Sequence, residues 1–164
     1  MASILPPRTR DRGFTLVEIL VVVALIVGMA AWLYPVSTTI QSEQALQTMT
    51  DEIVATLREA QTKAAAGERD RRWGVYFDPD PGGSNDRFVL FAGATYATRD
   101  ATFDRERPLP DSLALGSLTF TGGNAVVFDP VRGTTGNPGS LKLSTANGAA
   151  VTIRVNAAGT VETD

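Results

Sequence analysis

The hydrophobic residues of this chain are concentrated in one long run near its N-terminus. Eighteen of the 22 residues at positions 14–35 are apolar, and residues 19–33 are apolar throughout apart from Gly28. As a helix, Phe14–Tyr34 would be about 31 Å long, which is enough to cross the hydrocarbon core of a membrane. Three arginines precede the run: Arg8, Arg10 and Arg12. Because such residues stay in the cytoplasm, the pattern predicts a membrane anchor followed by an exported C-terminal part.

A second pattern follows, in which apolar residues recur at intervals of three or four positions. This spacing places them on one stripe of an α-helix and predicts that the stripe packs against a sheet. The stripe consists of Leu46, Met49, Ile53, Leu57, Ala60 and Ala64. We expect one helix from Leu16 to about Ala66, bent at Pro35 because proline lacks an N–H to donate. Gly67 is expected to end it, since glycine is favoured just beyond helix C-termini.

Short apolar runs, typical of strands, replace the helical pattern after Gly67. They lie at residues 73–77, 88–91, 113–115, 118–120, 125–128, 141–143 and 151–155. Turn residues separate several of them, at Asp78–Asp86, at Gly122–Asn124 and at Asn147-Gly148, the strongest hairpin signal in the chain. The sequence therefore predicts an α+β fold. A long N-terminal helix, with a transmembrane half and an amphipathic half, packs on an antiparallel β-sheet of about six or seven strands.

The composition excludes several classes of chemistry. The 164 residues include 15 Lys+Arg and 18 Asp+Glu, for a net charge of −3, and neither Cys nor His occurs. Disulfides, Cys-ligated zinc, thiolate nucleophiles and Ser-His-Asp triads are therefore impossible. The mild acidity argues against nucleic acid as a partner, since phosphates attract a basic surface. No catalytic constellation is present, so we expect neither enzymatic activity nor a cofactor.

Glu18 is the unusual residue of the apolar run. An ionisable side chain at membrane depth is costly and indicates a function, and no basic residue accompanies it within the run. A secretory signal peptide would have a shorter apolar run and a small-residue cleavage site after it, which Met29–Trp32 imitates poorly. A plain membrane anchor would not explain the carboxylate. Glu18 needs a partner outside its own helix, and the free N-terminal amine of a neighbouring chain would serve.

Residues 12–18, which read Arg-Gly-Phe-Thr-Leu-Val-Glu, resemble the class III signal of type IV prepilins and type II secretion pseudopilins. The resemblance implies that a membrane prepilin peptidase cleaves between Gly13 and Phe14 and N-methylates Phe14. It also implies that Glu18 pairs with the N-terminal amine of a neighbouring subunit in a filament. Pro35 matches the proline that commonly ends or bends the membrane half of a pilin helix.

The C-terminal half extends this resemblance to FimT/GspH-like minor pilins and pseudopilins. Four β-rich segments carry it: Val127–Gly133, Leu141–Ser144, Val151–Val155 and Gly159–Val161. Residues 92–112 contribute nothing to it. The implied fold is a pilin-like roll in four parts: a leader peptide at 1–13, a transmembrane and assembly helix at 14–35, its amphipathic continuation at 36–67, and a β-rich globular head at 68–164.

The resemblance implies a structural subunit, a minor pilin or pseudopilin of a type IV pilus or type II secretion pseudopilus. Its partners would be prepilin peptidase, other pilin or pseudopilin subunits, an inner-membrane assembly platform and the membrane. The chain would be a single-pass inner-membrane protein with an exported domain, and later part of a periplasmic or cell-surface filament. Two alternatives stay open: a major pilin of the same filament class, and a DNA-binding pilin for natural transformation. Against the second, the terminal region offers Arg154 but ends with two acids, Glu162 and Asp164.

Two loops have weaker claims to a ligand. Asp78, Asp80 and Asp86 are weak candidates for a Ca²⁺ site, since hard cations take clustered carboxylates. Their spacing is not that of an EF-hand, and the Asp-Pro-Asp-Pro-Gly-Gly run is explained as a hairpin connection, so we expect no metal. Gly133–Gly139 lacks the Gly-Lys-Ser/Thr ending of a phosphate loop and is expected to be a surface loop.

Overall fold

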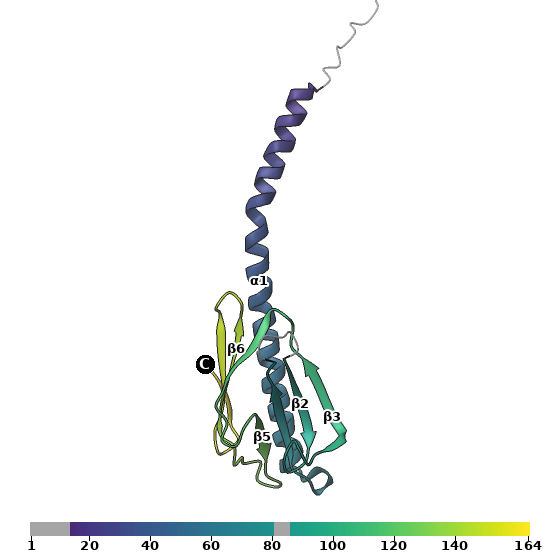
Figure 1. Ribbon diagram of the computed structural model, residues 1–164, viewed down its shortest axis with the longest axis vertical. Helices are drawn as coiled ribbons and strands as arrows, with labels where there is room; N and C mark the ends of the chain where they lie inside the picture. Colours follow the sequence, from purple (N-terminus) through teal and green to yellow (C-terminus); the bar gives the residue numbers. More distant parts are fainter. Residues whose placement is uncertain (1–13, 81–85) are drawn as a thin grey trace, which may run out of the picture. The chain divides into compact units, whose positions relative to one another are not determined.

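The computed structural model describes residues 14–80 and 86–164, with the backbone alone for residues 31–40 (Figure 1). The chain forms two compact units, Met1–Thr38 and Thr39–Asp164. Within the described ranges, one long helix (α1) is followed by a short 3-10 turn, Glu68–Asp70, and eight strands. The α+β fold expected from the sequence, a long helix with an antiparallel β domain, is confirmed.

Helix α1 spans Leu16–Ala65. In the second unit its buried side is the predicted stripe: Ile53, Leu57, Ala60 and Ala64 are fully buried, and Leu46 and Met49 nearly so. The helix ends at Ala65, close to the predicted end at about Ala66. Gly67 adopts the left-handed conformation expected just beyond a helix C-terminus, with φ of 63°. Its N–H then donates to the Ala64 carbonyl at 2.9 Å, which satisfies one of the last carbonyls of the helix.

The strands form two antiparallel sheets. Sheet A has the order β3-β2-β1-β5, and sheet B the order β4-β6-β7-β8. Sheet A comprises β1 (Trp73–Asp78), β2 (Arg87–Ala92), β3 (Asp100–Pro108) and β5 (Ala125–Phe128). Sheet B comprises β4 (Leu113–Leu118), β6 (Gly139–Thr145), β7 (Ala150–Val155) and β8 (Val161–Thr163). The expected single set of six or seven strands is therefore eight strands divided between two sheets.

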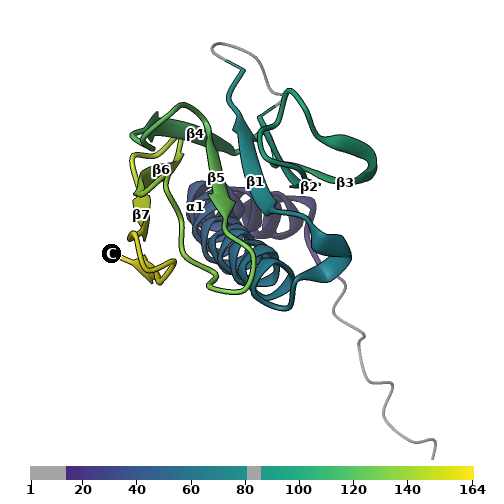
Figure 2. The ribbon, with the colours of Figure 1, turned by 90° about the horizontal axis from the view of Figure 1, so that it is seen from below.

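The main core lies between the buried stripe of α1 and the inner faces of both sheets. Alternate residues of each strand point to it, as the two-residue period of a strand requires. Those that are fully buried include Val75 and Phe77 of β1, Leu141 and Leu143 of β6, and Ile153 of β7. Figure 2 shows strands of both sheets gathered around one side of the helix.

Sheet A also buries part of its other face. Val89, Phe91 and Val127 are buried there without belonging to the main core. Gly74 lies among them, and a Cβ at this position would come within 2.5 Å of the Val126 carbonyl oxygen and 3.0 Å of the Phe91 ring. Tyr96, from the β2–β3 connection, covers the edge of Phe91 at a ring distance of 5.5 Å.

The turns follow the sequence signals. Asn147-Gly148 lies in the β6–β7 hairpin, where Gly148 has a φ of 89° and its N–H donates to the Thr145 carbonyl at 3.1 Å. A turn closed by a left-handed glycine is a common three-residue hairpin loop. The Asp78–Asp86 cluster connects β1 to β2, which pair with Asp78 opposite Arg87.

Candidate functional site

The start of α1 places Glu18 in a helix cap. Leu16 is the first helical residue, so Thr15 is the N-cap and Glu18 the third residue of the helix. The Glu18 N–H donates to the Thr15 hydroxyl oxygen at 3.2 Å, and the Ile19 N–H donates to the Thr15 carbonyl at the same distance. Thr-x-x-Glu is also the sequence signature of a capping box. Glu18 therefore also suits the positive end of the helix dipole.

Residues 14–30 present an apolar surface around this carboxylate. Of the thirteen exposed large hydrophobic side chains in the described part of the chain, twelve lie between Phe14 and Met29. Phe14, Glu18, Ile19, Val22 and Val23 line a shallow hollow, so the carboxylate borders an apolar groove. Contiguous apolar surface of this kind is typical of an interaction site for protein or lipid. Where side chains are described, no helix has an apolar stretch long enough to qualify as a membrane span.

Two predicted positions of the N-terminal region are not tested by the structure. Gly13 and the rest of the predicted leader lie outside the described residues, so cleavage between Gly13 and Phe14 stays a prediction. Phe14 is described and is 79% exposed directly before the N-cap. Pro35 lies where α1 is helical but only the backbone is described, and the expected bend also stays a prediction.

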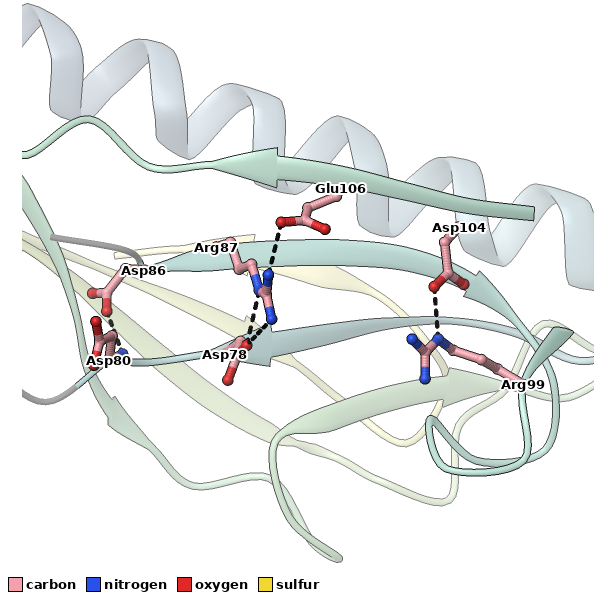
Figure 3. A network of polar contacts seen from close by, with 7 residues as sticks. All are labelled: Asp78, Asp80, Asp86, Arg87, Arg99, Asp104 and Glu106. Carbon is pink, nitrogen blue, oxygen red and sulfur yellow. Dashed lines mark hydrogen bonds and ion pairs between the residues drawn. The ribbon is translucent and has the colours of Figure 1, made fainter. Parts of the chain in front are cut away.

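The three aspartates proposed as weak metal candidates bind protein groups (Figure 3). The buried Asp86 carboxylate accepts hydrogen bonds from the Asp80 N–H at 2.6 Å and from the Leu115 N–H at 2.5 Å. Asp78 forms an ion pair with Arg87 at 2.7 Å. No group of three metal-binding side chains gathers within the described ranges. Asp86 thus joins the β1–β2 connection of sheet A to β4 of sheet B.

The outer face of sheet A carries charge pairs and stacked aromatic rings. Arg87 binds Glu106 at 2.9 Å as well as Asp78, and these hydrogen bonds, the one to Asp78 above all, raise its pKa. Burial, followed by the nearby charge of Asp78, raises the pKa of Tyr76. The Tyr76 ring stacks on Tyr96 at 3.8 Å.

Arg99 completes this face. Its guanidinium lies 3.7 Å from the centre of the Tyr96 ring and forms a 2.7 Å ion pair with Asp104 (Figure 3). The two arginines drawn in Figure 3 are thus matched by the carboxylates of Asp78, Glu106 and Asp104, and the Asp86 carboxylate binds backbone N–H groups. Such pairing is typical of a structural face.

Arg154, the base that the DNA-binding alternative would use, lies on β7. It forms a 3.3 Å ion pair with Asp164 at the C-terminus. Seven further cations of the second unit form ion pairs: Lys63, Arg71, Arg72, Arg87, Arg99, Arg105 and Arg107. Arg58, Arg69, Arg132 and Lys142 form none with the residues that the structure describes. The charges of the paired cations are balanced locally, whereas phosphate binding favours an array of cations free to neutralise the backbone.

Two family models match this chain. The prokaryotic N-terminal methylation motif matches residues 8–32, which include Gly13, Phe14 and Glu18. The model of the type II transport protein GspH matches residues 30–159, more than three quarters of the chain. The chain belongs to the GspH family. Neither the comparison with curated proteins nor the comparison with solved structures returned a match.

Membership of the GspH family confirms the predicted resemblance to prepilins and pseudopilins. With the methylation motif, it makes the chain a subunit of the type II secretion and type IV pilin-like class. The family is one of structural proteins, membrane-anchored and exported as filament subunits. In general terms it implies processing by prepilin peptidase and contact with other pseudopilin subunits.

Proposed function

We propose that this GspH-family chain is a minor pilin or pseudopilin that is made as a prepilin and assembled through its N-terminal helix. Prepilin peptidase cleaves between Gly13 and Phe14 and methylates Phe14. The observation that carries the proposal is the start of α1, where Glu18 is the one charged residue of an exposed apolar segment.

Because the peptidase cleaves before the apolar run and not after it, the mature chain keeps the run. The run then stays attached and anchors the protein in the inner membrane, while the head is exported. The platform in the inner membrane extracts the subunit into a filament. A second consequence of cleavage is a new amine at Phe14, the residue before the N-cap.

That amine is the cation that Glu18 requires. Residues 14–30 contain neither Lys nor Arg, so no side chain of this segment can neutralise the carboxylate. An unpaired charge is costly among apolar side chains, and a neighbouring subunit's N-terminal amine removes that cost only when the two chains assemble. Glu18 therefore favours assembled over isolated subunits.

The capping box allows a sharp test of this role. Glu18→Gln keeps a side chain that fits a capping box but removes the charge, whereas Glu18→Ala removes both. We expect both variants to enter the membrane and both to be depleted from sheared filaments, as measured by immunoblotting. Glu18→Asp, which keeps the charge, is the matched control. Normal incorporation of Glu18→Gln would contradict the ion pair and leave the capping role as the explanation.

Processing is tested at the preceding residue. Gly13→Ala adds a Cβ next to the bond to be cut and is expected to leave the leader in place, whereas Thr9→Ala, within the leader, is expected to be processed normally. Intact-mass analysis of membranes from cells that contain the peptidase measures both the cleavage and the methyl group. A wild-type chain that keeps its leader under these conditions would refute the proposal.

We also propose that the head acts by contact and not by catalysis or nucleic-acid binding. The ion pairs formed by eight of the twelve cations of the second unit support this, including that of Arg154 with Asp164. The measurement is a titration of the detergent-solubilised chain with DNA at several salt concentrations. Salt-dependent binding at micromolar protein would favour the DNA-uptake alternative instead.

A further inference from the structure

Strained backbone gathers at the C-terminal end of α1. The non-glycine residues with positive φ in the described part of the chain are Arg69, Asp70 and Val131, at 62°, 53° and 67°. Arg69 and Asp70 follow shortly after the helix, and the Val131 N–H donates to the Ala64 carbonyl at 3.1 Å. Figure 1 shows the segment after α1 and the β5–β6 connection at the same end of the helix. Such outliers are typical of ligand-binding and switch regions.

Val131 is the centre of a tight turn. The Arg132 N–H donates to the Pro130 carbonyl at 2.7 Å, so the three residues form a γ-turn. A γ-turn whose central residue has a positive φ is the rarer and more strained kind, and a β-branched residue fits this conformation poorly. The turn is held from the helix, because the Gln61 amide donates to the Gly133 carbonyl at 3.0 Å. The fold thus maintains a conformation that the residue itself disfavours.

The strained side chain is also exposed. Val131 is 79% exposed, and it is the one strongly exposed large hydrophobic residue among the described residues of the second unit. The surface beside it is low, since Gly133 has no side chain and a Cβ there would lie 3.4 Å from the Cβ of Ala65. Val131 therefore projects from a loop, where it gains nothing from the core and costs backbone strain. A pocket on a partner would account for both features.

Charged residues at the same end of the helix are unpaired. Arg132 and Asp70 are exposed and form no side-chain hydrogen bond or ion pair with any residue that the structure describes. The Arg69 guanidinium lies 4.4 Å from the centre of the Phe103 ring and pairs with no described carboxylate. An apolar centre with a polar rim is the usual anatomy of a protein interface. We call Arg69, Asp70, Val131 and Arg132 the end surface.

We propose that the end surface docks on a protein other than a copy of this chain, with Val131 in an apolar pocket of that partner. Arg132 meets a carboxylate at the rim of the pocket. The pocket follows from the single projecting side chain, and the carboxylate follows from charge complementarity with the unpaired cation beside it. Because the turn is fixed before binding, little conformational entropy is lost when the partner binds.

Other occupants fit this surface less well. A lipid surface favours several large apolar side chains together with cations, whereas the end surface has one such side chain and includes Asp70. The Asp70 carboxylate also disfavours a nucleic acid, whose phosphates it repels. Two copies that met symmetrically at Val131 would bring their Arg132 side chains together, with like charges.

This docking role rests on the proposed function, in which the head acts by contact. The proposed function assigns assembly to residues 14–30, at the start of α1, and does not say what the head contacts. The end surface supplies that contact at the other end of the same helix.

Val131→Asn separates strain from binding. Asparagine adopts the left-handed region readily but lacks the apolar branch, so the variant should be more stable and should bind less well. We expect the unfolding midpoint of the detergent-solubilised full-length chain to rise by about 2–4 °C. Val131→Ile keeps both the strain and the apolar side chain, and is the matched control. A midpoint that does not rise in Val131→Asn would overturn the proposal.

Photo-cross-linking in intact cells measures the docking. The probe is Ala66→p-benzoylphenylalanine in the full-length chain, at an exposed position just after α1, with the assembly machinery present. We expect one adduct of constant mass. Ala146→p-benzoylphenylalanine should not give it, because the β6–β7 hairpin lies at the other end of the head, where Asn147 donates to Ser42.

The second-site variants decide whether this adduct reports the proposed contact. Val131→Asn and Arg132→Glu should each reduce it about fivefold or more, whereas Val131→Ile and Arg132→Lys should retain it. The proposal is overturned if either of the first two variants leaves the adduct unchanged. It is also overturned if no adduct specific to Ala66 forms, or if the adduct contains a second copy of this chain, lipid or nucleic acid.

Sheared filaments from the same cells separate this inference from the proposed function. Val131→Asn should be processed and recovered there like the wild type, because Val131 lies outside the segment assigned to assembly. If the chain is recovered in filaments but the adduct is missing, the end surface is wrong and the subunit assignment stands. If wild-type chains are neither processed nor recovered, the proposed function itself fails.

Discussion

Residues 14–30 and the second unit, Thr39–Asp164, place the same kinds of side chain in opposite environments. Both contain leucine, isoleucine and valine on helix α1, yet Leu20 is 61% exposed and Leu57 is fully buried. In the second unit these residues are buried within the chain, against the inner faces of two sheets. Between Phe14 and Met29, the large hydrophobic side chains named above are exposed in the part of the chain that the structure describes. The second unit thus buries its apolar residues within the chain, and we expect residues 14–30 to bury theirs against lipid or other subunits.

The largest expected difference between the regions lies in the unfolding of the head. Leu57→Ala should lower its free energy of unfolding by about 2–5 kcal/mol, because a fully buried leucine leaves a cavity. Leu20→Ala is the matched control and should leave it unchanged. Urea denaturation of the detergent-solubilised chain, followed by Trp73 fluorescence in a Trp32→Phe background, measures both. Equal effects would mean that the two regions do not differ as described.

A close approach of two loops is the next test. Gly159 has a φ of 85°, and a Cβ there would collide with the Gly133 carbonyl and come within 2.5 Å of the Gln61 amide nitrogen. Gly159→Ala should therefore destabilise the head by about 2–3 kcal/mol. Gly136→Ala, in a loop position with open space around it, should be close to neutral in the same assay.

Removing the link that Asp86 forms between the sheets should lower the free energy of unfolding somewhat less. Asp86→Ala leaves the N–H groups of Asp80 and Leu115 without their acceptor, at a cost of about 1–3 kcal/mol. Asp111→Ala, at an exposed carboxylate, is the control and should cost little. A metal role would show itself differently, as a Ca²⁺-dependent rise in the unfolding midpoint that Asp86→Ala abolishes; we expect no such rise.

The smallest effect is expected at the surface ion pairs. Arg107→Ala removes the contact between β3 and Glu52, whose two side chains are 55% and 38% exposed. Exposed pairs contribute from nothing to about 1 kcal/mol, and salt screens them. The difference between Arg107→Ala and the wild type should therefore shrink further in 1 M salt. A loss comparable to that of Leu57→Ala would contradict the separation between core and surface.

The helix and most strands could be predicted because their signals are local. The three-four spacing from Leu46 to Ala64 and the left-handed Gly67 describe α1 without reference to the rest of the chain. The same holds for the Asn147-Gly148 hairpin. The N-terminal motif predicts a role for Glu18 and a cleavage site between Gly13 and Phe14, and both stay predictions. The cap that Thr15 forms agrees with the Thr-x-x-Glu signature in the sequence.

Strand β3 could not be predicted from such signals. Five of its nine residues are charged, a composition more typical of a loop than of a buried strand. In the structure β3 lies at the edge of sheet A. Edge strands are commonly charged because the charges discourage pairing with other chains. The division of the strands into two sheets could not be predicted either, because it depends on which strands pair, and paired strands can be distant in sequence.

The buried stripe has a mechanical consequence. Six side chains anchor the head to α1 over 18 residues, or about 27 Å. A pull along the helix axis loads these anchors side by side, in shear, so they resist together. A pull across the axis would open them one after another, as a zipper opens. A subunit drawn lengthwise by its N-terminal helix is thus loaded in the direction in which its head is hardest to detach.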